Sequence, residues 1–364
     1  MACERIDLDA VEESRDIVHR AVACLVQGGV VALPTESGLL PVANALSSTA
    51  VAELLRVAPL IPNARPSLLI SSAEALRDWV PSIGARVRKL ARRAWPGPLG
   101  LIFPESSVGA LSARLPLTSL QAWRHESTYR FRSPGHPFVR DVLSLLPGPI
   151  LTMGEFSKSA GQNVAGVSMI VESSRGRRQG PTTAVLVEVD QWRIVEPGAI
   201  TEKEVASMSG TTILFVCTGN TCRSPMAEAL CKVLLAKRLG CEPDDLIARG
   251  YVVLSAGVGA MNGMPAASHA IDVVKEHGGS LDEHASRKVS ADLLKGADLV
   301  LAMTSDHLDT LRELSGEAAE RTILLDPDGD DVPDPYGSDL ESYRRTASAL
   351  ERFLEQLLDS REFH

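Results

Sequence analysis

The stretch that decides the fold of the second half of the chain is CTGNTCRSP, residues 217–225. It follows the apolar run TTILFV and precedes a long amphipathic segment, which indicates a loop between a strand and a helix. We expect Ser224 at the N-cap and Pro225 as the first helical residue. Such a loop points free backbone N–H groups and the positive end of the helix dipole at one place, so it predicts an anion site of phosphate size. The Gly-Lys-Ser/Thr ending of a Walker loop is absent.

A thiol and a guanidinium flank this predicted anion. Cys217 is the only cysteine of the sequence with an arginine, Arg223, six residues later. The arginine can clamp two oxygens of a phosphate. A helix N-terminus and a nearby guanidinium stabilise a thiolate, which is the nucleophilic form of cysteine, and the Ser224 hydroxyl can donate to that sulfur. The pattern predicts nucleophilic attack by Cys217 on phosphorus.

The rest of the loop is expected to wrap the phosphate, and glycine and asparagine suit the left-handed backbone that turns amides inward. A buried structural cysteine, a surface salt bridge and a simple helix cap are the alternative interpretations of Cys217, Arg223 and Ser224. A zinc site on the two cysteines would need further ligands at short spacing, so we expect no metal and no cofactor. The remaining predicted phosphate-binding residues are Thr218, Gly219, Asn220, Thr221 and Cys222.

A departing group also needs a proton donor. The acidic loop DGDDVPDPYGSD, residues 328–339, places Asp334 between two prolines that stiffen it. Asp334 is the predicted general acid, and Tyr336 is a predicted wall of the substrate pocket. An aspartate in such a loop is otherwise a turn residue.

The chain length of 364 residues favours two domains. After residue 210, apolar runs alternate regularly with helical patterns, which predicts an α/β domain with a doubly wound parallel sheet. The first half is expected to be a mixed α+β domain with a twisted sheet, starting with a helix over 9–27 and containing strands at 30–34, 66–71, 99–103, 149–153, 168–172 and 183–189. Residues 200–210 are polar and turn-prone and form the expected linker, so the predicted domains are 1–208 and 211–364.

Composition excludes several classes of protein. The sequence begins with acidic residues instead of a signal peptide and has no apolar run of about 18 residues, so we expect a soluble cytoplasmic protein without membrane contact. The cysteines lack a disulfide-framework spacing and are expected to be reduced. The acidic composition of the second half argues against nucleic-acid binding by that half. The basic cluster at 86–93 in the first half is either a contact for a polyanion or a solvated helix face.

Together these motifs resemble the low-molecular-weight protein tyrosine phosphatase family over roughly residues 211–360. The resemblance rests on Cys-x5-Arg-Ser-Pro after a strand, Asp-Pro-Tyr before the last helix, SAG at 255–257 and HASR at 284–287. It implies Cys217 as nucleophile, Arg223 as transition-state clamp, Ser224 as thiolate partner, Asn220 as loop organiser and Asp334 as general acid, with phosphorylated proteins as substrates.

Within that family, CTGNTCRSPMAE is most similar to the bacterial protein-arginine-phosphatase branch. Thr221 stands where tyrosine phosphatases carry a bulky aliphatic residue, so it is also a predicted substrate-pocket residue. The downstream cysteine pair of arsenate reductases is missing, since no cysteine follows Cys241.

The first half resembles the YrdC-like threonylcarbamoyl-adenylate synthase family, through ALPTES (32–37), WPGPLGLIF (95–103), RFRSPGHP (130–137), GPTTAVLVE (180–188) and VEPGAI (195–200). Each motif is altered. The expected Lys-x-Arg cluster reads RVAPL, the Ser-Ala-Asn stretch reads Met153-Gly154-Glu155, and the arginine of a closing Arg-Pro-Gly reads Glu196. Because these changes remove cations where the family holds triphosphate, we expect lost or altered synthase activity.

Three function classes follow. The first is a phosphatase with a synthase-like binding or regulatory domain, in which Thr35, Arg130 and Arg132 line a pocket for an anion or nucleotide. A strand-end hydroxyl and surface ion pairs are the alternative interpretation of these three residues. The second class is a bifunctional enzyme with an active synthase, and the third is a thiol redox switch in which Cys217 and Cys222 form a disulfide.

Overall fold

The computed structural model describes residues 3–61, 64–156, 165–174, 180–189 and 191–360. The chain divides into two compact units, Met1–Ser209 and Gly210–His364. Among the described helices, none is both long enough and apolar enough to cross a membrane.

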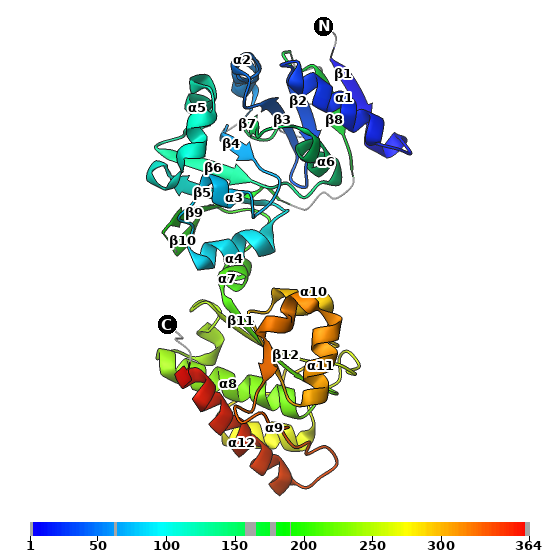
Figure 1. The fold of residues 1–364 in the computed structure, drawn as a ribbon, viewed down its shortest axis with the longest axis vertical. Coiled ribbons are helices and arrows are strands. Elements are labelled where there is room, and N and C mark those ends of the chain that lie inside the picture. Colours follow the sequence, from blue (N-terminus) through cyan, green and yellow to red (C-terminus); the bar gives the residue numbers. More distant parts are fainter. Residues whose placement is uncertain (1–2, 62–63, 157–164, 175–179, 190, 361–364) are drawn as a thin grey trace. The chain divides into compact units, whose positions relative to one another are not determined.

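The first unit is a mixed sheet with helices on both faces (Figure 1). Its strands lie in the order β1-β8-β2-β3-β7-β4-β6-β5-β9-β10 within the described residues. They are β1 (Glu4–Asp7), β2 (Val31–Pro34), β3 (Leu39–Asn44), β4 (Ser67–Leu69), β5 (Leu99–Pro104), β6 (Thr128–Arg132), β7 (Ile150–Thr152), β8 (Met169–Glu172), β9 (Thr183–Glu188) and β10 (Gln191–Glu196).

Alternating side chains of these strands supply two separate cores. Val31 and Leu33 of β2 pack on the face that α1 and α6 cover, whereas Ala32 packs on the opposite face. The α-helices of the unit are α1 (Arg15–Val26), α2 (Ser48–Val57), α3 (Leu76–Trp79), α4 (Ala85–Ala94), α5 (Leu117–Trp123), α6 (Pro137–Leu145) and α7 (Glu202–Ser209).

Two local predictions for this unit are wrong. The expected helix over 9–27 begins at Arg15, because Asp9 accepts hydrogen bonds from the Ser173 hydroxyl and the Ser174 amide and ties its segment to the end of β8. The expected linker at 200–210 contains α7. Thr201 and Glu204 cap that helix reciprocally, with Thr201 N–H 2.7 Å from Glu204 Oε2 and Glu204 N–H 3.3 Å from Thr201 Oγ1.

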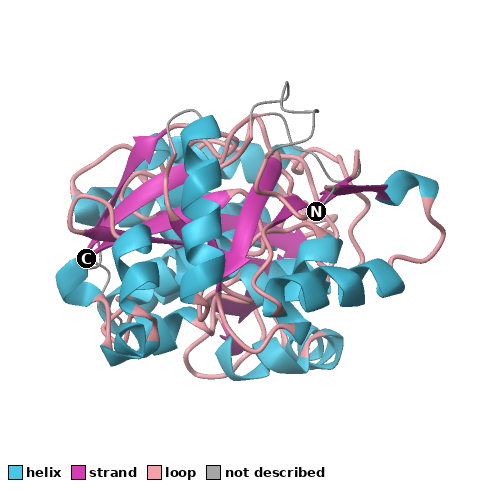
Figure 2. Ribbon diagram, turned by 90° about the horizontal axis from the view of Figure 1, so that it is seen from above, coloured by secondary structure: helices cyan, strands magenta, loops and turns pink. Residues whose placement is uncertain are grey.

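The second unit has the predicted α/β architecture, with a parallel sheet in the order β12-β11-β13-β14. In β11, Ile213 and Phe215 pack against one core while Leu214 and Val216 pack against the other, so β11 is buried on both faces. Figure 2 distinguishes the helices and strands of the chain by colour. The elements are β11 (Thr211–Cys217), α8 (Arg223–Leu239), β12 (Tyr251–Gly257), α9 (Ser268–Glu276), α10 (Ala291–Gly296), β13 (Leu299–Ala302), α11 (Ser305–Leu314), β14 (Thr322–Leu324) and α12 (Leu340–Ser360).

Candidate active site

The loop after β11 is organised around the sulfur of Cys217. The Asn220 amide donates to Cys217 Sγ across 3.2 Å, and Ser224 Oγ lies 2.9 Å from the same sulfur. Cys217 is only 3% exposed. The backbone amide of Asn220 and the hydroxyl of Ser224 therefore both contact one buried sulfur.

α8 begins at Arg223, two residues before Pro225, the residue predicted to begin the helix. Cys222 occupies the N-cap position and Arg223 is the first residue of α8, so Ser224 lies inside the first turn. There its hydroxyl oxygen lies 2.9 Å from Cys217 Sγ and 3.2 Å from the Ala256 carbonyl oxygen, so its single proton can be donated to either of these two atoms. The predicted contact between Ser224 and the sulfur is present, but the cap assignment is wrong.

Asn220 holds the loop in shape and is completely buried. Its φ of +55° lies in the left-handed region, whereas Gly219 is outside that region, so only the asparagine uses the conformation predicted for both residues. Its side-chain amide donates to Ser224 Oγ at 3.0 Å and to Ser255 Oγ at 2.9 Å. Its side-chain carbonyl accepts from the Arg287 amide at 2.8 Å.

The SAG and HASR segments support the same loop. A Cβ on Gly257 would lie 2.4 Å from the Thr218 carbonyl oxygen and 2.9 Å from Asn220 N, so the loop can approach β12 only because residue 257 is glycine. His284 Nε2 lies 2.9 Å from the Asn220 carbonyl oxygen. These roles were not predicted individually, although both motifs stood out in the sequence.

Arg223 and Asp334 both line the cavity above the loop and contact each other directly. Arg223 Nη2 donates to Asp334 Oδ2 at 2.6 Å, and Arg223 Nη1 donates to the Val332 carbonyl at 3.1 Å. The Arg223 side chain is buried, whereas that of Asp334 is 44% exposed. The structure thus brings together the predicted clamp and the predicted acid, and the acid faces solvent.

The cavity above the loop has a volume of about 520 Å³. Cys217, Thr218, Gly219, Thr221, Cys222, Arg223, Asp334 and Tyr336 line it, so most of the predicted site residues share one cavity. Tyr336 is 76% exposed and forms an open wall. Methionines 261 and 264, which sequence reasoning missed, line the apolar side of the same cavity.

His307 is a further residue that sequence reasoning missed. Its Nε2 atom lies 2.9 Å from Thr218 Oγ1, and its Nδ1 atom lies 2.8 Å from the hydroxyl of Thr304, the N-cap of α11. Burial, and secondly the Arg223 charge, hold the pKa of His307 below its ordinary value. A neutral imidazole can donate to one hydroxyl and accept from the other, so His307 links the loop after β11 to α11.

Cys222 lines the cavity as a free thiol. All six cysteines are free, and Cys222 Sγ lies 3.2 Å from the Tyr343 hydroxyl. Burial raises the pKa of the Cys222 thiol. Among the described residues, no group of three or more His, Cys, Asp or Glu side chains is arranged to hold a metal ion.

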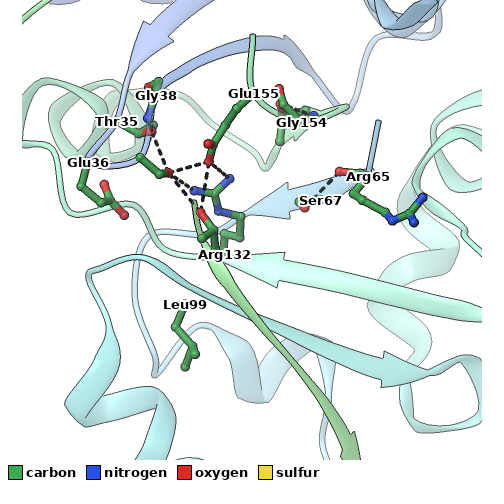
Figure 3. Close-up of polar contacts among 12 residues, drawn as sticks. Thr35, Glu36, Gly38, Arg65, Ser67, Leu99, Arg132, Gly154 and Glu155 are labelled. Atoms are coloured by element: carbon green, nitrogen blue, oxygen red, sulfur yellow. Dashed lines mark hydrogen bonds and ion pairs between the residues drawn. The ribbon is translucent and has the colours of Figure 1, made fainter. Parts of the chain in front are cut away.

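The three candidate residues of the first unit are each paired within the chain. Figure 3 shows two of them, Thr35 and Arg132. Thr35 follows β2 directly and its hydroxyl donates to the Gly38 carbonyl at 2.8 Å, as expected of a strand-end hydroxyl. Arg130 Nη2 lies 2.6 Å from Glu196 Oε1. Arg132 Nη1 lies 3.1 Å from Glu155 Oε1. Arg132 is buried and Glu155 is half-buried, which corrects the interpretation of Arg132 as a surface ion pair.

Comparison with known proteins identifies relatives of both units. Residues 212–362 match the family model described as Low molecular weight phosphotyrosine protein phosphatase. Residues 23–198 match the Sua5–YciO–YrdC model, described as Telomere recombination. The first unit is therefore YrdC-like, as its motifs predicted.

Individual relatives cover the second unit. The chain is 37% identical over 150 residues to the low molecular weight protein-tyrosine-phosphatase Etp of Escherichia coli K12, which covers 41% of this chain and 93% of that protein. It is 39% identical over 149 residues to the protein-arginine-phosphatase of Bacillus subtilis, covering 40% and 93%. A crystal structure of the low molecular weight protein tyrosine phosphatase from T. tengcongensis matches with 38% identity and a TM-score of 0.38, covering 42% of this chain and 100% of that chain. Through residues 212–362, the chain belongs to the low molecular weight phosphotyrosine protein phosphatase family.

Proposed function

We propose that the second unit is a cysteine-dependent protein phosphatase that hydrolyses phosphoarginine in proteins through a phosphocysteine intermediate. One observation carries this proposal: the Asn220 amide and the Ser224 hydroxyl converge on Cys217 Sγ, inside a cavity that Arg223 and Asp334 also line. A nucleophile, an anion clamp and a proton donor are the groups that phosphoryl transfer through a covalent intermediate requires.

The first chemical step forms the phosphocysteine. The Cys217 thiolate attacks phosphorus, and an S–P bond forms as the P–N bond to the substrate guanidinium breaks. Asp334 donates its proton to the departing nitrogen, while Arg223 and the loop amides bind the equatorial oxygens.

The second step releases phosphate. The Asp334 carboxylate, now deprotonated, accepts a proton from water as the water oxygen attacks phosphorus. The S–P bond breaks, inorganic phosphate leaves and the Cys217 thiolate is restored. Ser224 supports the thiolate in both steps because its hydroxyl lies 2.9 Å from the sulfur.

Thr221 supports phosphoarginine as the substrate. It lines the cavity, and its hydroxyl lies 3.7 Å from Cys222 Sγ, so a polar atom is available beside the substrate. A phosphorylated guanidinium presents N–H donors to such an atom, whereas a phosphotyrosine ring does not. A relative named protein-arginine-phosphatase is consistent with this choice.

Phosphotyrosine is the second candidate substrate, and a specific observation favours it. Tyr336 and Met261 line the cavity and are 76% and 70% exposed, so they offer an apolar surface on which an aromatic ring can pack. Relatives named protein-tyrosine-phosphatase agree with that alternative.

Phosphate release from a phosphoarginine peptide tests the proposed activity. The wild type should release phosphate, and Cys217→Ser should abolish turnover because a hydroxyl is a far weaker nucleophile. Cys241→Ser, which changes a half-buried cysteine away from the cavity, is the matched control and should keep full activity. Equal turnover by the wild type and Cys217→Ser would refute the proposal.

For the first unit we propose a binding or regulatory role without synthase activity. Glu196 accepts from Arg130 at 2.6 Å and from Arg65 at 3.2 Å, and Glu155 accepts from Arg132 at 3.1 Å. Burial raises the pKa of Glu196, but the hydrogen bonds and charges of the two arginines outweigh it and hold the pKa below its ordinary value. Acidic residues at two altered motifs thus neutralise arginines that a polyphosphate would need.

A further inference from the structure

Glu155 lies in the first unit with one carboxylate oxygen held by three side chains. Arg132 Nη1 lies 3.1 Å from Glu155 Oε1, and the Thr182 hydroxyl donates to the same oxygen at 3.1 Å. The Ser37 hydroxyl donates to it at 2.5 Å. Figure 3 shows these contacts converging between Glu155 and Arg132.

The three donors form a preassembled group, which we call the oxyanion cradle (Ser37, Arg132 and Thr182). Ser37 Oγ also accepts from Arg132 Nη2 at 3.2 Å and lies 3.0 Å from Thr182 Oγ1. Ser37 lies in the turn after β2, Arg132 ends β6 and Thr182 precedes β9, so three separate segments build the cradle. A guanidinium and two hydroxyls at one point form a strong site for an oxyanion.

The backbone around Glu155 is shaped to deliver its carboxylate. Gly154 has a φ of +124°, and a Cβ there would lie 3.3 Å from Ile61 Cγ2. The Phe156 amide donates to the Leu39 carbonyl at 2.9 Å, which anchors the other side of Glu155 to β3. At Gly38 a Cβ would lie 3.4 Å from Glu155 Oε2, so the glycine leaves space for the second carboxylate oxygen.

We propose that the oxyanion cradle is an anion-binding site and that Glu155 is its resident anion, an internal substitute for a free carboxylate or phosphate. Arg132 is 3% exposed, and its Nε atom has no hydrogen-bond partner among the described residues. The guanidinium therefore retains one donor that has no partner among the described residues. The Glu155 carboxylate thus keeps the oxyanion cradle filled without an anion from solution. This inference does not depend on the proposed phosphatase activity.

Removal of the internal anion and its replacement from solution test this inference in the full chain. All four tryptophans, at positions 79, 95, 123 and 192, lie in the first unit, so tryptophan fluorescence follows the unfolding of that unit alone. Glu155→Ala removes the carboxylate, and Glu155→Ser also leaves a small hydroxyl. Glu172→Ala is the matched control, because it removes a half-buried carboxylate that pairs with Arg5 outside the cradle.

The probes are sodium acetate and inorganic phosphate, with chloride keeping the ionic strength constant. Both Glu155 variants should unfold at a lower temperature than the wild type. At about ten times its dissociation constant, either probe should then raise their Tm by about 3–5 °C more than that of the wild type or Glu172→Ala. Equal responses of all four proteins would overturn the inference, as would Glu155 variants that stay unfolded even with both anions present.

Discussion

Arg223 Nη2 lies 2.6 Å from Asp334 Oδ2, and this pair joins the first residue of α8 to a loop residue 111 positions later in the chain. The Tyr336 amide also donates to Asp334 Oδ1 at 3.2 Å. The carboxylate is therefore held in the lining of the cavity, partly exposed to solvent and beside the cation that would bind the phosphate.

Asp334→Asn removes the proposed proton donor while keeping the size of the side chain. Turnover should fall roughly 100-fold or more, because general acid catalysis contributes about that factor. Steady-state kinetics should show a larger loss for substrates with poor leaving groups than for p-nitrophenyl phosphate. Asp330→Asn, an exposed residue of the same loop, is the control and should leave turnover unchanged.

Cys222→Ser tests a redox role for the two loop cysteines. Cys222 lines the same cavity as Cys217, and a disulfide between them would protect the nucleophile from further oxidation. Peroxide should inhibit the wild type reversibly, with recovery in dithiothreitol, and should inhibit Cys222→Ser irreversibly. Full recovery of the variant would exclude this protective role.

Thr221→Ile tests the substrate assignment. The change removes a hydroxyl from the cavity wall and adds apolar surface, so the ratio of kcat/KM for phosphoarginine over phosphotyrosine peptides should fall about 10–100-fold. Thr310→Ile makes the same change on the exposed surface of α11 and should leave the ratio unaltered. A wild type that prefers phosphotyrosine, with no change of ratio on substitution, would favour the tyrosine phosphatase alternative.

His307→Asn tests the link between Thr218 and α11. Because burial lowers the pKa of His307 below its ordinary value of 6.5, the neutral ring stabilises the folded unit above about pH 6.5. That contribution is lost as the pH falls toward the folded-state pKa, since protonation then favours the unfolded chain. The asparagine of the variant retains a donor and an acceptor but does not titrate.

Calorimetry between pH 7 and 5 can follow the unfolding of the second unit, which contains none of the four tryptophans. The Tm of that transition should depend less on pH in His307→Asn than in the wild type. The charged groups that also act on His307 are Arg223, Asp306, Asp331 and Asp334, so the measurement needs constant ionic strength. Parallel profiles for variant and wild type would contradict the proposed titration.

The full chain should not convert threonine, bicarbonate and ATP to threonylcarbamoyl-adenylate. Arg132 and Arg130 already form ion pairs with Glu155 and Glu196, and these carboxylates would repel a triphosphate. The measurement is pyrophosphate release together with mass spectrometry of the adenylate, with a YrdC-like synthase of known activity as positive control. Formation of the product would show that both units are enzymes.

Most of the second unit could be predicted from the sequence. The apolar run TTILFV lies in β11 as expected, and strands alternate with helices after residue 210, because each element buries a continuous apolar face. In the first unit, β1, β3, β6 and β10 were missed. β10 has exposed and half-buried residues in alternation, and β6 contains two arginines, so their apolar patterns are weak.

The sequence by itself determined the local features of this protein: the order of strand, loop and helix, the cysteine with an arginine six residues later, and the altered motifs of the first half. Only the tertiary structure decided which distant groups meet. It brings Asp334 into contact with Arg223, Glu155 with Arg132 and His307 with Thr218. Such pairings depend on strand order and on burial. Burial makes an unpaired charge or hydroxyl energetically costly. Each partner is therefore fixed by the packing of the whole unit and not by its neighbours in the chain.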